Sequence, residues 1–63
     1  MDKQTAWIKY WEVCKVNDGC FLIGEVRHHP RVKDGTMVET SRLLSIDFEN
    51  NEAETLNTIY QLK

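Results

Sequence analysis

Apolar and polar residues alternate along most of the chain with the two-residue period of β-strands. Four stretches rich in β-branched and aromatic residues carry this alternation, at residues 6–16, 20–28, 36–48 and 55–62. Residues that tolerate a positive φ separate them at 17–19 and 34–35, and a polar link covers 49–54. The pattern predicts an all-β fold, either a small SH3-like barrel or a strongly bent antiparallel sheet of four to five strands.

The first two stretches are expected to form a β-hairpin with a three-residue loop and Gly19 in the left-handed conformation. This loop places Val16 opposite Cys20. In the resulting register, one face of the hairpin is almost entirely apolar. Glu12 then lies opposite Gly24, which has no side chain to obstruct it. Agreement between the turn residues and the apolar pattern favours this register.

A second hairpin is expected between the third and fourth stretches, with a loop over 49–55. Phe48 then lies opposite Leu56, and Ile46 lies opposite Thr58. Residues 40–42 interrupt the alternation, so we expect a bulge or a break there that bends one long strand into two.

Two stretches also fit helical spacing. Trp7, Trp11 and Cys14 recur at a helical interval within residues 5–14, and Asn51 can cap a helix over residues 52–62. An α+β fold with a helix at either place is therefore the alternative to the all-β prediction.

Length and composition restrict the architecture further. The chain has 63 residues, a net charge of −2, 41% apolar and 29% charged residues, which is the balance of one globular domain over residues 1–63. A core of this size seldom supplies more than ~3–5 kcal/mol, so a disulfide, a metal or a second subunit is expected to add stability. The longest apolar run covers only residues 20–23, and the first residues lack a signal-peptide pattern, so the prediction is a protein of the host cytoplasm without a membrane span.

Residues that could carry chemistry are few. Cys14, Cys20, His28 and His29 are potential zinc ligands, but their spacing matches no usual zinc motif, and the register favours buried thiols. The acidic residues between 47 and 54 fall in a predicted turn and not in a cleft. No nucleophile motif or phosphate-binding glycine loop is present. We therefore expect no enzyme activity, no metal and no cofactor.

The second face of the predicted first hairpin gathers its larger apolar side chains. A four-stranded sheet of this length cannot easily cover both of its faces, so these side chains are expected to pack inside a closed barrel or against a second chain. A platform for stacking nucleic-acid bases is a third possibility. The candidate partner-binding residues are Trp7, Trp11, Phe21 and Ile23.

The most distinctive charged segment is residues 27–33. Pro30 fixes its own φ and favours an extended His29, so the basic groups are expected on a stiff loop before the turn at 34–35. Such a loop is suited to hold phosphate, a nucleotide or an acidic protein surface, and a solvated loop is the alternative. The candidate anion-binding residues are Arg27, His28, His29, Arg31 and Lys33.

From residue 24 onward the chain carries an ordered set of short motifs. They are Gly-Glu-Val at 24–26, His-Pro-Arg at 29–31, Asp-Gly-Thr at 34–36, Thr-Ser at 40–41 and a closing Tyr-Gln-Leu at 60–62. In this order the chain resembles a set of small uncharacterised β-rich proteins encoded in phages and prophages. The resemblance implies β structure for residues 55–62 and a viral accessory role, and it does not extend to residues 7–14.

Three functions are consistent with these observations. The first is a non-enzymatic accessory binding protein, expected to be a homodimer, that engages or inhibits a host protein such as a component of restriction, CRISPR or another defence. The second is a module that binds a nucleotide, a nucleic acid or another anion through the basic loop at 27–33. The third is a structural subunit of a larger assembly.

Overall fold

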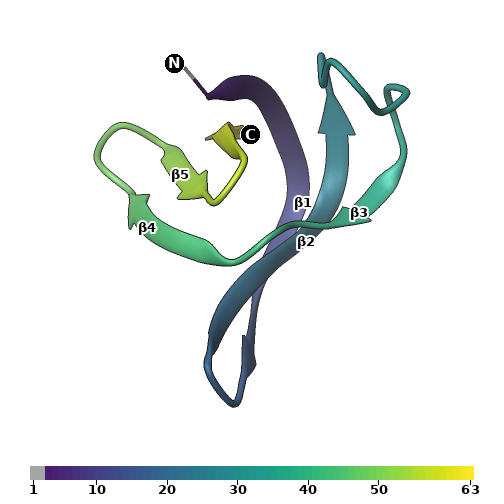
Figure 1. The fold of residues 1–63 in the computed structure, drawn as a ribbon. Helices are drawn as coiled ribbons and strands as arrows, with labels where there is room; N and C mark the ends of the chain where they lie inside the picture. Colours follow the sequence, from purple (N-terminus) through teal and green to yellow (C-terminus); the bar gives the residue numbers. More distant parts are fainter. Residues whose placement is uncertain (1–2) are drawn as a thin grey trace.

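The computed structural model describes residues 3–63, and these residues form six strands and no helix. The strands are β1 (Gln4–Val16), β2 (Gly19–Arg27), β3 (Met37–Glu39), β4 (Leu43–Asp47), β5 (Glu52–Thr55) and β6 (Thr58–Leu62) (Figure 1). The all-β prediction is confirmed. The helical alternatives at 5–14 and 52–62 are wrong, because strand pairing places these residues in β1, β5 and β6 and buries their alternate side chains.

The six strands belong to one sheet in the order β3-β2-β1-β6-β5-β4. β1 and β6 run parallel, and the other neighbouring pairs are antiparallel. The sheet is therefore mixed and has six strands, whereas the sequence predicted a purely antiparallel sheet of four to five. The number of strands differs because residues 36–62, from the third predicted stretch to the fourth, form four strands, β3 to β6. The sheet is mixed because β6 lies beside β1 and runs parallel to it.

The two edge strands of this sheet, β3 and β4, are consecutive in the chain and are joined only by residues 40–42. A link of this length spans at most about 14 Å. The sheet must therefore curl until its two edges approach each other. β4 indeed contacts β2 (Figure 1). Within residues 3–63, however, no strand pairing joins β4 to β2 or β3, and the sheet is not closed into a barrel. The expected interruption at 40–42 is confirmed.

The register of the β1–β2 hairpin differs from the prediction. Its turn has two residues, with Val16 opposite Gly19, and a bulge follows in β1 between Lys9 and Glu12. Tyr10 lies within this bulge and has a φ of 52°. A bulge adds one residue to one strand only, so the side chains of β1 exchange faces across it.

The predicted loop at 49–55 is also wrong, since β5 occupies most of it. The real turn covers residues 48–51, and Ile46 lies opposite Ala53. The Asp47 carboxylate closes this turn by accepting hydrogen bonds from the backbone N–H groups of Glu49 and Asn50 at 3.0 and 3.2 Å. Asparagine and aspartate side chains favour such turns over longer loops.

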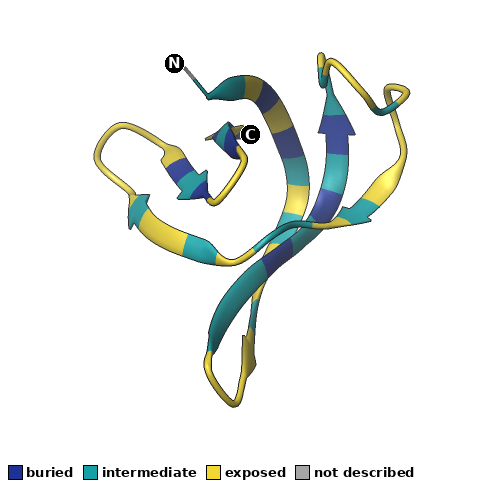
Figure 2. Ribbon diagram, in the orientation of Figure 1, coloured by how far each residue is buried: buried dark blue, intermediate teal, exposed yellow. Residues whose placement is uncertain are grey.

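The buried side chains form one core cluster on one face of the sheet, which we call the inner face. Figure 2 shows the buried positions along the strands. Strands β1, β2, β5 and β6 supply the buried side chains of the inner face, and the opposite face is called the outer face. The buried residues are Ala6, Ile8, Leu22, Val26, Ala53, Thr55, Thr58, Tyr60 and Leu62. No helix in residues 3–63 is long and apolar enough to cross a membrane.

Candidate functional site

Trp7 lies on the outer face, near the centre of the sheet. Its neighbours in β1, Ala6 and Ile8, point into the core, so strand alternation directs Trp7 away from it. The pairing places Trp7 between Arg27 of β2 and Gln61 of β6. With 39% of its surface exposed, Trp7 has a backbone fixed on both sides and a side chain open to solvent.

Two basic side chains contact the Trp7 ring from residues far apart in the sequence. The His28 ring meets it edge-on with ring centroids 4.4 Å apart, and Lys63 Nζ lies 4.3 Å from its centroid. His28 has a φ of 57°, and its backbone N–H donates to Asp34 Oδ1 at 2.8 Å. The turn at Asp34 therefore holds His28 in a left-handed conformation beside Trp7.

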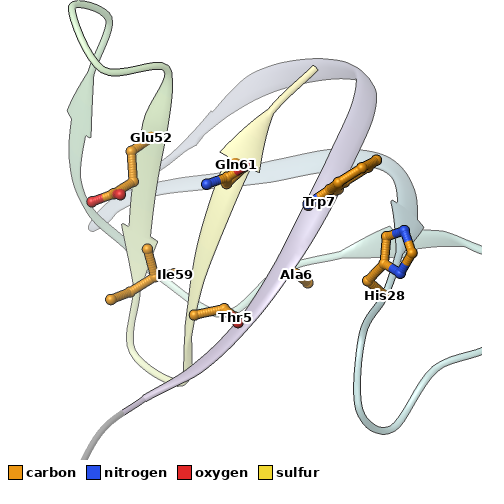
Figure 3. Close-up of a pocket in the computed structure, with 7 residues that line it drawn as sticks. All are labelled: Thr5, Ala6, Trp7, His28, Glu52, Ile59 and Gln61. Carbon is orange, nitrogen blue, oxygen red and sulfur yellow. The ribbon is translucent and has the colours of Figure 1, made fainter.

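A hollow of about 200 Å³ opens beside Trp7 on the outer face (Figure 3). Trp7 and Ile59 contribute apolar surface to it, whereas Gln61 and Glu52 contribute polar groups. Pockets for drug-sized molecules usually measure about 300–1,000 Å³, so this space fits a single side chain better than a cofactor. We call it the Trp7 hollow, and it is lined by Thr5, Ala6, Trp7, His28, Glu52, Ile59 and Gln61.

The four predicted partner-binding residues do not share one surface. Trp7, Phe21 and Ile23 lie on the outer face, but Trp11 packs against the core on the inner face, with its ring 6.4 Å from that of Phe48. The β1 bulge is the reason, because it moves Trp11 to the face opposite Trp7. Two charged residues that lie opposite each other, Lys9 of β1 and Glu25 of β2, also separate Trp7 from Phe21 and Ile23.

The five predicted anion-binding residues also diverge. Arg27 Nη2 is paired with Glu25 Oε1 at 3.2 Å, and His28 contacts Trp7. His29 instead approaches Tyr60, whose ring centroid is 6.4 Å away.

The remaining two members of that set follow the same loop further. Arg31 lines a separate depression with Lys3, Gln4 and Asn57, and Lys33 is exposed. Arg31 also lines one depression with His28 and another with His29. Basic residues 27–33 thus meet in pairs and reach both faces of the sheet, but the five do not form one cluster.

Besides Thr5 and Ala6, the neighbours of Trp7 in β1, sequence reasoning missed Glu52, Ile59, Gln61 and Lys63. These four lie on this face because β6 pairs in parallel with β1, more than 50 positions away in the chain, and β5 then brings Glu52 opposite Gln61. The alternation of residues 58–62 does predict that Gln61 points away from the core, on the opposite face of its strand from Tyr60 and Leu62. Nothing local, however, indicates that this strand lies beside β1.

The two cysteines point to different faces. Cys14 lies opposite Phe21 on the outer face, and Cys20 lies opposite Lys15 on the inner face. Both thiols are free and half-buried. In the part of the chain that the structure describes, no three histidine, cysteine or acidic side chains come together as a metal site would require.

Among residues 3–63, two side chains have displaced pKa values, and both lie outside the Trp7 hollow. Burial raises the pKa of Tyr60, whereas hydrogen bonds from the Asn50 side chain and from the backbone N–H groups of Asn50 and Glu49 lower the pKa of Asp47. Tyr60 belongs to the core and Asp47 to the β4–β5 turn. The two shifts therefore report on the core and on the β4–β5 turn.

Comparison with family models, with curated proteins and with solved structures found no match for this chain. Its function has to be inferred from the chemistry of its own residues.

Proposed function

We propose that the chain is a non-enzymatic binding protein that engages a host protein through the Trp7 hollow. The occupant is one apolar side chain from an acidic segment of the partner. The observation that carries this proposal is a tryptophan that is 39% exposed, beside a space of about 200 Å³, with basic groups around it.

The rigidity of Trp7 supports this role. Its strand is paired on both sides, with β2 and with β6, so little backbone entropy is lost when a partner binds. Tryptophan and arginine are the residues that most often dominate binding energy at protein interfaces. Trp7 and Arg27 are directly paired here.

The charge around the hollow supports an acidic partner. Lys63 Nζ lies over the Trp7 ring, Arg27 is the β2 residue paired with Trp7, and Lys9 lies further along the same face. Glu25 offsets the charge of Arg27 through its ion pair, and the Glu52 carboxylate lines the hollow itself, so the attraction for an acidic partner comes from Lys63 and Lys9. The surface therefore favours carboxylates, which speed association more than they tighten the complex.

The proposed origin is a phage or a prophage, and it rests on the resemblance in residues 24–62 alone. An accessory protein from such a source acts on host machinery, and a defence system is the target that we propose. A stoichiometric binder of this kind needs no catalytic residues, which suits the site described above.

The test is a pull-down from a lysate of the host bacterium with three immobilised proteins. These are the wild type, Trp7→Ala, and Phe48→Ala as the matched control, since Phe48 is an exposed aromatic residue of the β4–β5 turn. We expect one host protein to bind the wild type and the control, to be lost with Trp7→Ala, and to elute as salt rises. Circular dichroism checks that each variant is folded.

Two results contradict the proposal. One is retention of the same proteins by all three baits, and the other is the absence of any retained protein at low salt. Recovery of a virion component in place of a host protein would instead indicate a structural subunit.

A second candidate function has one observation in its favour. A depression at the end of the sheet is lined by Lys3, Gln4, Thr5, His28, Pro30 and Arg31, which places two cations and an imidazole around one opening. Lys3 is partly neutralised by Glu54 at 2.6 Å, so Arg31 would carry most of the attraction for an anion.

The anion hypothesis is tested by titrating inorganic phosphate and a short single-stranded oligonucleotide into labelled protein by NMR. Binding should shift the Arg31 signals, weaken as salt rises, and be lost in Arg31→Glu but not in Lys33→Glu. Equal effects of the two reversals would show nonspecific attraction only.

A further inference from the structure

The far half of β1 has an unpaired edge. β6 pairs with β1 only from Gln4 to Ile8, and the Lys63 N–H to Ile8 O hydrogen bond of 2.8 Å is the last contact along this edge. Beyond the bulge at Tyr10, β1 pairs with β2 alone within residues 3–63. On its other side, β2 pairs with β3 at Ile23 and bonds to Thr40 at Leu22, so residues 14–16 and 19–21 form a two-stranded ribbon that extends beyond the other strands (Figure 1). We call this ribbon, together with the free β1 edge at 12 and 13, the arm.

The arm exposes apolar surface as well as backbone. Val13 and Val16 are 45% and 49% exposed. A hairpin of two strands is only marginally stable in water, and a free edge offers N–H and C=O groups to another strand. The arm consequently gains stability from a further strand.

We propose that two copies of this chain pair through the free edges of their arms, with β1 antiparallel to β1 of the second copy. Two identical strands satisfy each other's backbone groups automatically when they are related by a two-fold axis. The product is a continuous four-stranded ribbon in the order β2-β1-β1-β2. This interface does not use the Trp7 hollow, so the two proposals can fail separately.

The side chains select one register. A two-fold axis perpendicular to the ribbon keeps the inner faces of both copies on the same side, so a residue must lie opposite one of its own face. With the axis at Val13, the two valines meet at the centre, and Trp11 lies opposite Lys15 of the second copy. An ammonium group over an indole ring is a favourable pair, and it occurs twice in this arrangement.

Neighbouring registers are worse. An axis at Glu12 places two carboxylates opposite each other, which is destabilising. An axis at Cys14 places Lys15 opposite Val13 and leaves Trp11 opposite Asn17 of the turn. The edge from 12 to 16 carries one acidic and one basic residue, so the two copies do not repel each other.

The proposal is tested by the mass of the full chain in solution. Sedimentation across a concentration series should show a dimer, with twice the 7.4 kDa of one chain. Val13→Lys places like charges at the axis, and such a pair costs several kcal/mol, so the dissociation constant should rise at least about 100-fold. Leu56→Lys is the matched control, since it makes the same change at a residue 54% exposed in the β5–β6 turn.

A cross-link tests the register independently of stability. In a Cys14→Ser, Cys20→Ser background, Val13→Cys should form a disulfide-linked dimer under mild oxidation, because opposed Cα atoms in antiparallel strands lie about 4.5–5.5 Å apart, within the range of about 4.4–6.8 Å that a disulfide spans. Thr5→Cys, on the paired half of β1, should stay monomeric. A wild-type monomer at every concentration overturns the proposal, as does a dimer that persists in Val13→Lys. A dimer without the Val13→Cys cross-link also overturns it.

Discussion

Ile8 occupies the space above Gly24. A Cβ built on Gly24 would lie 2.6 Å from Ile8 Cγ1 and 2.9 Å from Ile8 Cδ1, and also 2.9 Å from the backbone oxygen of Lys9. Ile8 is fully buried, and the Lys9 oxygen belongs to the strand itself, so neither has room to move. Gly24 is therefore what lets β1 and β2 approach closely beside the bulge.

Gly24→Ala should lower the free energy of unfolding by about 1–3 kcal/mol, as overpacking of a dense core does. Urea denaturation of the wild type and the variant measures the difference. Ile8→Ala removes the atoms that the new methyl group meets, so the double variant should cost less than the sum of the two single variants. Additive losses would show that the two positions do not interact.

Local sequence was a good guide to most of the strands, but not to β5, which lies in a segment predicted as a loop. β-branched and aromatic residues placed most strands, and the break at residues 40–42 was also expected. The bulge was not expected, because nothing in the sequence around Tyr10 and Trp11 indicates a left-handed residue within a strand. The extra residue of the bulge reverses the faces of β1, so the prediction wrongly placed Trp11 on the same face as Trp7.

Sequence reasoning also recovered only part of the candidate site. Trp7 and His28 were singled out, but as members of different groups, an apolar face and a basic loop. Their contact depends on the left-handed turn at His28, and the contribution of Gln61 depends on a parallel pairing between the two ends of the chain. Pairings of this range follow from the closure of the whole sheet and leave no local pattern.

A prediction of stability concerns the buried hydroxyl of Thr55. Its Oγ1 donates to the Thr58 carbonyl oxygen at 3.1 Å and accepts from the Thr58 N–H at 3.2 Å, and both residues are buried. Thr55→Val leaves two buried groups without this partner, so the unfolding free energy should fall by about 1–3 kcal/mol.

Chemical denaturation measures this loss. Thr55→Ser keeps the hydroxyl and should recover part of the stability. Thr5→Val makes the same substitution at an exposed position of β1 and should have little effect. A loss as large in Thr55→Ser as in Thr55→Val would mean that packing, and not the hydrogen bonds, stabilises the β5–β6 turn.

The acid dependence of folding should depend partly on Asp47. Hydrogen bonds from Asn50 and Glu49 lower its pKa in the folded state from the ordinary 3.8, so the folded protein binds this proton more weakly than the unfolded chain does. The resulting stability is present above pH 3.8 and is lost as the pH falls through the lower folded value. In thermal unfolding from pH 2 to pH 6, Asp47→Asn should show a flatter decline in Tm. Glu49→Gln, whose side chain does not close the turn, should follow the wild type.

The alkaline limit of stability should depend on Tyr60. Burial raises its pKa in the folded state above the ordinary 10.0, so the unfolded chain releases this proton first as the pH rises. Ionisation of Tyr60 leaves the unfolding free energy unchanged below pH 10.0, and that free energy should fall as the pH rises from there through the folded value. Tyr60→Phe removes this contribution, so its stability should decline less steeply between pH 9 and pH 11.5 than that of the wild type.

Tyr10→Phe is the matched control because Tyr10 is 75% exposed, and urea denaturation at each pH measures all three proteins. Parallel declines for the wild type and Tyr60→Phe would mean that ionisation of this phenol does not limit stability in base.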